Sequence, residues 1–123
     1  MDKEKKRETL VRFSDAWRRR DVEGVLACFA PNAVYSASVG PAPGREARGA
    51  AEIAALIGRM FEHDDGAVIH ISDMEVTQAR ASWKWRYDLP DGSTEFGCDF
   101  FTFSGGRILL KDAYRKIKME NDR

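Results

Sequence analysis

The sequence predicts an α+β fold, with helices packed on one face of a strongly curved, mixed or antiparallel sheet. Up to about residue 63 the apolar side chains recur at the helical spacing, and from Ala67 onward they alternate with period two. One early strand, over residues 33–39, interrupts the helical part. Helices followed by a run of long strands bury their apolar faces best as two packed layers. The 123 residues suit one domain, residues 1–123, without repeats or linkers.

Three helices are expected in the first half of the chain. In the first, Leu10, Phe13 and Trp17 recur at positions i, i+3 and i+7, while lysine and arginine fill the other face. Asp21 is suited to cap a short second helix, which ends at the sequence Ala-Pro-Asn of residues 30–32. The third helix follows Gly49 and stops at residues 64–66, with apolar positions Ile53, Leu56, Ile57, Met60 and Phe61.

The second half of the chain has the pattern of strands joined by turns. Residues 83–87, with the sequence WKWRY, alternate aromatic with basic side chains, which is typical of a strand with one buried face. Turns at residues 90–92 and 104–106 flank a strand over 93–103, and a last strand runs over 107–118. The proline- and glycine-rich segment 40–44 is predicted to be a loop and a candidate lid.

Composition excludes several classes of function. Twenty basic and 20 acidic residues give a net charge of zero, so the basic excess that nucleic-acid binding requires is absent. No apolar run approaches the length of about 18 residues that spans a bilayer, so no membrane partner is expected. The charged start MDKEKKRETL does not resemble a secretory signal, and a cytoplasmic location is expected. Cys28 and Cys98 are accordingly expected to be reduced, buried thiols.

Over nearly its whole length the chain resembles the nuclear transport factor 2-like superfamily, in particular its SnoaL-like and ketosteroid-isomerase-like branches. The resemblance rests on the helical start VRFSDAWRRRDVEGVLACFAPNAVY, the glycine-bounded loop with the third helix, the strand IHISDMEV, and CDFFTFSGGRI leading into KDAYRK. It implies a cone, with the bent sheet wrapped around the helices and an apolar pocket at the wide end, often in a homodimer. No cofactor and no metal is implied.

An aromatic wall supports the expectation of a pocket for a small molecule. Mostly apolar cavities with a few polar groups are the usual sites for such ligands. The residues expected to line the pocket are Trp17, Tyr35, Trp83, Trp85, Phe101, Lys111 and Arg115. The alternative is that these rings simply fill the cone.

Asp99 is the first candidate for chemistry. Period two places it on the same face as Phe101 and Phe103, and a carboxyl on an aromatic wall has a raised pKa unless a cation compensates. The resemblance aligns it with the strand aspartic acid that hydrogen-bonds the oxyanion in ketosteroid isomerases, a known example of a carboxyl kept neutral by its apolar site. Pairing with a neighbouring cation or main-chain group is the alternative.

Other catalytic positions of the related enzymes are not matched. Phe13 stands where the isomerases have a tyrosine on the first helix, and Ala37 stands where they have the general base. Arg18 occupies the position of the first-helix aspartate of scytalone dehydratases, and Ala113 that of the last-strand aspartate of limonene epoxide hydrolases. A steroid-isomerase mechanism is therefore disfavoured.

His70 is the second candidate, because a neutral imidazole on a strand lining the cone could act as a general base or a hydrogen-bond donor. A core or exposed position is the alternative. His63 lies beside Asp64 at a helix end and is expected at the surface. A metal site made of His63, Asp64 and His70 is disfavoured because the spacing fits no ligand pattern.

The register of the last strand decides which residue lies opposite Asp99. A three-residue turn places Lys111 there, with Lys111, Ala113 and Arg115 inside the cone and Arg115 as an anchor for an anion. A two-residue turn at Gly105 and Gly106 places Asp112 there, so that two carboxyls share a proton. The first arrangement is favoured, since it gathers an apolar patch on the outer face that suits a dimer interface, formed by Phe100, Ile108, Leu110 and Tyr114.

The sequence thus predicts a SnoaL-like domain that binds a small, mostly apolar organic ligand in its cone. Whether it is catalytic stays open. Chemistry would be cofactor-free acid–base catalysis of the isomerase, cyclase, dehydratase or hydrolase type, with Asp99 and His70 handling protons. The alternative is a non-catalytic ligand-sensing or dimerisation module with a filled cone.

Overall fold

The computed structural model describes residues 3–119, which form three helices and one six-stranded sheet. The helices are α1 (Lys3–Arg18), α2 (Val22–Leu26) and α3 (Gly49–His63). The strands are β1 (Phe29–Ser36), β2 (Glu46–Arg48), β3 (Val68–Val76), β4 (Arg80–Asp88), β5 (Thr94–Ser104) and β6 (Arg107–Arg115).

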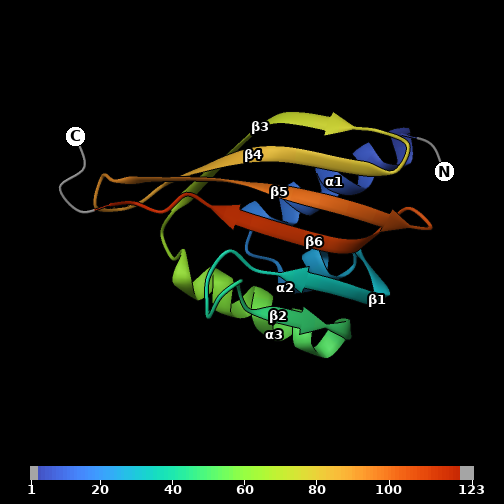
Figure 1. Ribbon diagram of the computed structural model, residues 1–123, viewed down its shortest axis with the longest axis horizontal. Helices are drawn as coiled ribbons and strands as arrows, with labels where there is room; N and C mark the ends of the chain where they lie inside the picture. The colour runs from blue at the N-terminus through green and yellow to red at the C-terminus, as the bar shows by residue number, and fades with distance from the viewer. Residues whose placement is uncertain (1–2, 120–123) are drawn as a thin grey trace.

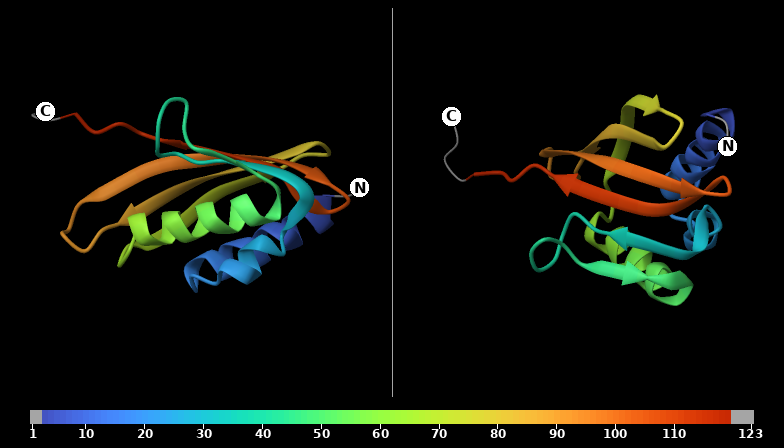
Figure 2. Two further views of the ribbon diagram at one scale, coloured as in Figure 1. Left: turned by 90° about the horizontal axis from the view of Figure 1, so that it is seen from below. Right: turned by 45° about the vertical axis from the view of Figure 1, so that its right-hand side comes forward.

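The sheet is open and mixed, with the strand order β2-β1-β6-β5-β4-β3 (Figure 1). Neighbouring strands are antiparallel except β1 and β6, which run parallel. The helices lie together on one face of the sheet (Figure 2, left). The predicted α+β class with helices on one face of a curved sheet is confirmed. No helix within residues 3–119 is both long and apolar enough to cross a membrane.

The helices form where the sequence predicts them. The apolar stripe of α1, with Leu10, Phe13 and Trp17, is buried against the sheet. The backbone of Arg20 adopts the left-handed region (φ 56°), which ends the helical path. Asp21 then caps α2, because its Oδ1 accepts a hydrogen bond from the Gly24 amide at 3.0 Å.

Strand β4 has the predicted alternation, with Trp83, Trp85 and Tyr87 buried and the basic residues between them exposed. The other strands begin or end differently from the prediction. β1 covers 29–36 instead of 33–39, and β6 ends at Arg115 instead of residue 118. The short edge strand β2, just after the predicted loop, was not predicted.

The register between β5 and β6 differs from both predicted alternatives, because Ala113 lies opposite Asp99. The turn has the two glycines of the second alternative, with Ser104 opposite Arg107, and a bulge then inserts one residue into β6. The inward face of β6 is that of the first alternative, with Lys111 and Ala113 buried. The bulge also turns Ile108 into the core, so the prediction of Ile108 on the outer face is wrong.

Candidate functional site

A small cavity lies inside the cone, between the sheet and helices α1 and α3. Its volume is about 20 Å³, which holds about one water molecule. Seven of the nine predicted site residues line it: Trp17, Tyr35, Trp83, Trp85, Asp99, Lys111 and Arg115. The eighth, Phe101, is buried beside the cavity, with its ring centroid 5.0 Å from that of Trp83. The ninth, His70, lies outside it.

The buried carboxylate of Asp99 is held by three hydrogen bonds. Trp83 Nε1 donates to Oδ2 at 2.7 Å, and Trp85 Nε1 donates to Oδ1 at 3.3 Å. Lys111 Nζ donates to Oδ1 at 3.2 Å, and both charged groups are buried. Period two along β4 places both indoles on the inner face, so the sequence pattern that gives the aromatic wall also supplies the donors.

Aromatic rings lie around the Lys111 ammonium group where it pairs with the Asp99 carboxylate. Its Nζ lies 4.5 Å from the ring centroid of Tyr35 and 5.2 Å from that of Trp17. These ring faces attract the ammonium group and partly replace the water that it loses on burial. The centre of the cone is therefore a buried, paired charge cluster, which matches the predicted pairing of Asp99 with a cation.

Tyr87 is a further cavity residue, part of the aromatic wall that the sequence indicates but not one of the nine predicted site residues. Its hydroxyl oxygen accepts a hydrogen bond from Trp17 Nε1 at 2.9 Å, which ties β4 to the end of α1. Burial raises the pKa of both Tyr87 and Tyr35 well above the ordinary value for a phenol, so both stay protonated at neutral pH. The alternation of β4, which puts Tyr87 on the face of Trp83 and Trp85, was the signal for it.

Arg115 lies at the wide end of the cone and is already neutralised. It forms ion pairs with Glu95 and, at 3.7 Å, with Asp64, and its Nε donates to Ser38 Oγ at 3.2 Å. The guanidinium group also lies 4.8 Å from the ring centroid of Trp85. The predicted role of Arg115 as an anchor for an anion would therefore require an anion to compete with two carboxylates. This cluster unites three distant segments, and sequence analysis missed it.

Asp64 is the member of that cluster with a buried oxygen that lacks a hydrogen-bond partner among the described residues. Its side chain is 4% exposed, and its Oδ2 has no hydrogen-bond partner among residues 3–119. Burial raises the pKa of Asp64, although the positive charges of Arg115 and His63 act in the opposite direction. Its position at the C-terminal end of α3 places it beside Arg115.

His70 does not join Asp99. It alternates with Ile69 and Ile71, whose side chains line the cavity, and therefore points to the other face of β3. The His70 side chain is 47% exposed, and its Nε2 lies 2.9 Å from Asp88 Oδ2. The expectation that His70 faces the cone is not met, which separates the two residues predicted to handle protons.

The possible metal ligands also group differently from the sequence hypothesis. Within residues 3–119, one group of possible ligand atoms lies within 4.8 Å of one another, and it consists of His63, Asp64 and Glu95 rather than His70. The guanidinium of Arg115 pairs with both carboxylates of this group. The positive charge of Arg115 therefore already neutralises the two carboxylates that a metal ion would need as ligands.

Cys28 and Cys98 are free thiols, but the expectation that both are buried is met by Cys28 alone. Cys28 is buried and Cys98 is half-buried on the outer face of β5. Burial raises the pKa of both thiols, which lowers their thiolate content and their reactivity.

Residues 10–110 match the model of the SnoaL-like domain. Because this match covers most of the 123 residues, the chain belongs to the SnoaL-like domain family. The fold is similarly that of nuclear transport factor 2-like proteins. One such protein of unknown function, from Mesorhizobium loti, is 26% identical with a TM-score of 0.81, over 94% of this chain and 93% of that one.

Two more distant structures carry functional names. A candidate ketosteroid isomerase from Kribbella flavida is 16% identical, with a TM-score of 0.78 over 99% of this chain and 85% of that one. A candidate polyketide cyclase from Xanthomonas campestris is 21% identical, with a TM-score of 0.69 over 93% and 92% of the two chains. At these identities the similarity concerns the fold alone. None of the curated proteins compared with the sequence matches it.

Proposed function

We propose that the protein is a non-catalytic homodimerisation module whose cone is filled by its own side chains. The observation that carries this proposal is the cavity volume of about 20 Å³. Pockets for small molecules typically measure a few hundred Å³. Asp99 has three donors, and Lys111 has both a carboxylate and ring faces, so the polar groups at the centre already have partners. The absence of a donor at Phe13 and of a base at Ala37 agrees with a non-catalytic role.

An outer aromatic patch offers the dimer interface. Phe96, Phe100 and Tyr114 lie on the face of β5 and β6 that points away from the helices, and their exposed fractions are 46%, 50% and 56%. The rings of Phe100 and Tyr114 pack edge to face with centroids 5.8 Å apart. Contiguous exposed apolar surface of this kind marks interfaces, and the same patch on two copies meets about a twofold axis.

Sedimentation equilibrium across a range of protein concentrations tests the dimer. The wild type is expected to have twice the chain mass of 13.9 kDa, and the double variant Phe100→Ser/Tyr114→Ser is expected to be monomeric with an unchanged circular dichroism spectrum. Val68→Ser is the matched control, because Val68 is 57% exposed on β3, away from the patch. A wild type that stays monomeric at high concentration contradicts the proposal.

A second candidate function, ligand binding in the cone, is favoured by the buried pair of Asp99 and Lys111. Desolvation makes a buried ion pair a poor source of stability, so a core used only for packing has little need for one. A ligand that opens the cone would find a hydrogen-bonding centre among the indoles. Any proton transfer would then involve Asp99, since His70 lies outside the cone.

Titration with apolar carbonyl compounds and carboxylic acids, followed by tryptophan fluorescence, tests this second function. Asp99→Asn should weaken binding and any turnover, whereas His70→Ala should leave both unchanged. Saturable binding that survives Asp99→Asn would contradict a role for the charged pair.

A further inference from the structure

A second and larger depression opens on the flank of the molecule, between the end of α1 and the start of β3. This flank groove has a volume of about 400 Å³, within the range of small-molecule sites, and is lined by Trp17, Arg18, Arg20, residues 67–70 and Tyr87. Its apolar part is formed by Trp17, Ile69 and Tyr87, and its cationic part by Arg18 and Arg20, while His70 lies at its border.

The flank groove adjoins the cavity in the cone. Trp17, Ile69 and Tyr87 line both spaces, and a hydrogen bond of 2.9 Å joins Trp17 to Tyr87 at the boundary. A molecule can therefore lie in the flank groove against these rings while the cone stays closed.

The positive charge of Arg20 is met by main-chain oxygens and by no carboxylate of the part of the chain that the structure describes. Its guanidinium nitrogens donate to the main-chain oxygens of Phe61 (2.9 Å), Asp64 (2.8 Å) and Ala67 (3.3 Å). These acceptors are uncharged, and no carboxylate oxygen within residues 3–119 lies within 4.0 Å of the Arg20 nitrogens. These bonds use both hydrogens of Nη2 and one of Nη1, so the Nε–H and one Nη1 hydrogen stay available. The guanidinium group is also fixed in place, because it bonds main-chain oxygens at the C-terminal end of α3 and lies 5.8 Å from the ring centroid of Phe61.

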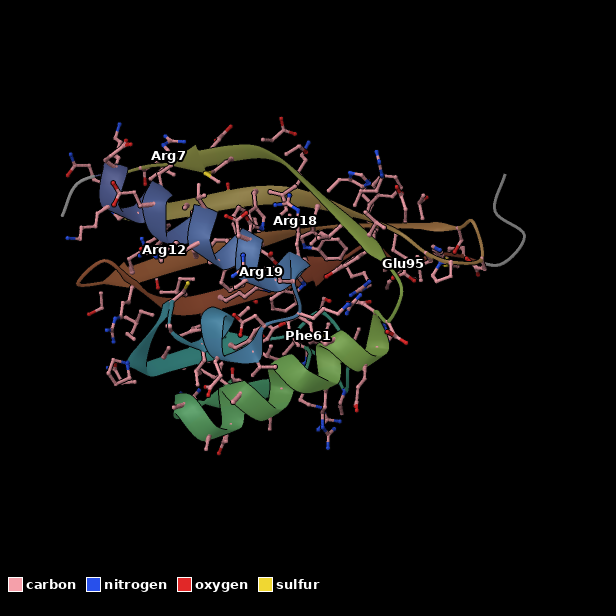
Figure 3. All side chains as sticks on the ribbon, turned by 180° about the vertical axis from the view of Figure 1, so that it is seen from behind. Arg7, Arg12, Arg18, Arg19, Phe61 and Glu95 are labelled. Carbon is pink, nitrogen blue, oxygen red and sulfur yellow. The ribbon has the colours of Figure 1, made fainter. Side chains whose placement is uncertain are left out.

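The other polar groups of the groove leave this excess of positive charge in place. Arg18 forms only a loose pair with Asp15, at 3.8 Å with both side chains about half exposed, and can turn toward the groove. His70 contacts Asp88, a carboxylate that Arg86 also neutralises. Arg18 lies on the side of α1 next to β3, near the groove, whereas its neighbour Arg19 does not line it (Figure 3).

We propose that the flank groove binds a small organic carboxylate with a flat apolar body. The body would lie against Trp17, Ile69 and Tyr87, and the carboxylate would meet the Arg20 guanidinium with Arg18 closing over it. The charge of Arg20 and its remaining N–H donors match a carboxylate oxygen, and the aromatic floor matches a planar ring. This site goes beyond the proposed dimerisation function and needs neither the outer aromatic patch nor an open cone.

Isothermal titration calorimetry with 2-naphthoate at low ionic strength tests the proposal, with the uncharged 2-naphthamide as the reference compound. Naphthoate is expected to bind saturably, and the amide at least about tenfold more weakly because it lacks the charge-assisted hydrogen bonds. Arg18→Glu is expected to weaken naphthoate binding by about tenfold or more, since it reverses a charge at the site. Arg19→Glu is the matched control, because it makes the same change in net charge beside the groove.

Each other result overturns the proposal. Absence of saturable binding removes the site, and equal affinity for acid and amide removes the role of the arginines. Equal losses in Arg18→Glu and Arg19→Glu would mean that only net charge matters. If Lys111→Met weakened binding and Arg18→Glu did not, the ligand would lie in the cone instead. A dimer measured by sedimentation would be unaffected in every case, so the failure of this site and that of the proposed function are distinguishable.

Discussion

Replacing Lys111 or Asp99 alone should lower the free energy of unfolding more than replacing both. Lys111→Met leaves the Asp99 carboxylate buried with only two indole donors, and removing one partner of a buried ion pair costs about 3–5 kcal/mol. Asp99→Asn leaves the ammonium unpaired for a similar loss. It also turns an amide NH₂ toward one indole N–H, which adds about 1–3 kcal/mol for an unsatisfied donor.

The double variant Asp99→Asn/Lys111→Met has no buried charge and keeps one indole bond. Only the cost of the unsatisfied indole donor, about 1–3 kcal/mol, should remain. The double variant should therefore be more stable than either single variant. Urea unfolding followed by far-ultraviolet circular dichroism measures the three free energies, with exposed Lys116→Met as a control expected to change little. Losses that simply add in the double variant would refute the account of the pair as a desolvated ion pair.

Three further changes probe the backbone, the wide end of the cone and a helix cap. Gly97→Ala should lower the free energy of unfolding in urea by about 1–3 kcal/mol, because a Cβ there would lie 2.2 Å from Trp85. Gly58→Ala, which has open space in α3, should raise it by about 0.5–1 kcal/mol. Equal effects of the two changes would contradict this reasoning. Burial raises the pKa of Asp64 in the folded state above its unfolded pKa of 3.8. The protonated carboxyl therefore contributes to stability below the unfolded pKa, and this contribution is lost as the pH rises through the folded pKa. The stability of wild type minus that of Asp64→Asn should therefore fall with rising pH over that window, and a rise would exclude the burial effect. Asp21→Ala should lose about 0.5–2 kcal/mol by uncapping α2, and a thermal melt unchanged from wild type would show that the cap is dispensable.

The helices and the central strand β4 were predictable because their signals are local. The stripe of Leu10, Phe13 and Trp17 and the alternation of WKWRY each arise within a few residues. His70 shows how a local signal can be present and overlooked. Its position between Ile69 and Ile71 implies the face opposite to theirs, and the two isoleucines are the residues that line the cavity.

Register and the wide end of the cone were not predictable, because they depend on contacts between distant segments. The bulge in β6 moves Ile108 inward and places Ala113 opposite Asp99, although the turn at Gly105 and Gly106 taken alone places Asp112 there. The cluster around Arg115 joins the end of α3, the start of β5 and the end of β6. A single sequence contains no local signal that aligns these three positions.

The double variant of Asp99 and Lys111 also separates the two candidate functions. If the cone only fills space, an uncharged centre that keeps the fold should leave sedimentation as a dimer unchanged, because the outer aromatic patch lies on the opposite face of the sheet. If the cone receives a ligand, the same variant should lose binding while keeping its stability, since the ionic centre that would recognise a polar group is gone. Stability, mass and ligand binding measured on this one protein therefore show whether the buried charges serve the fold or a ligand.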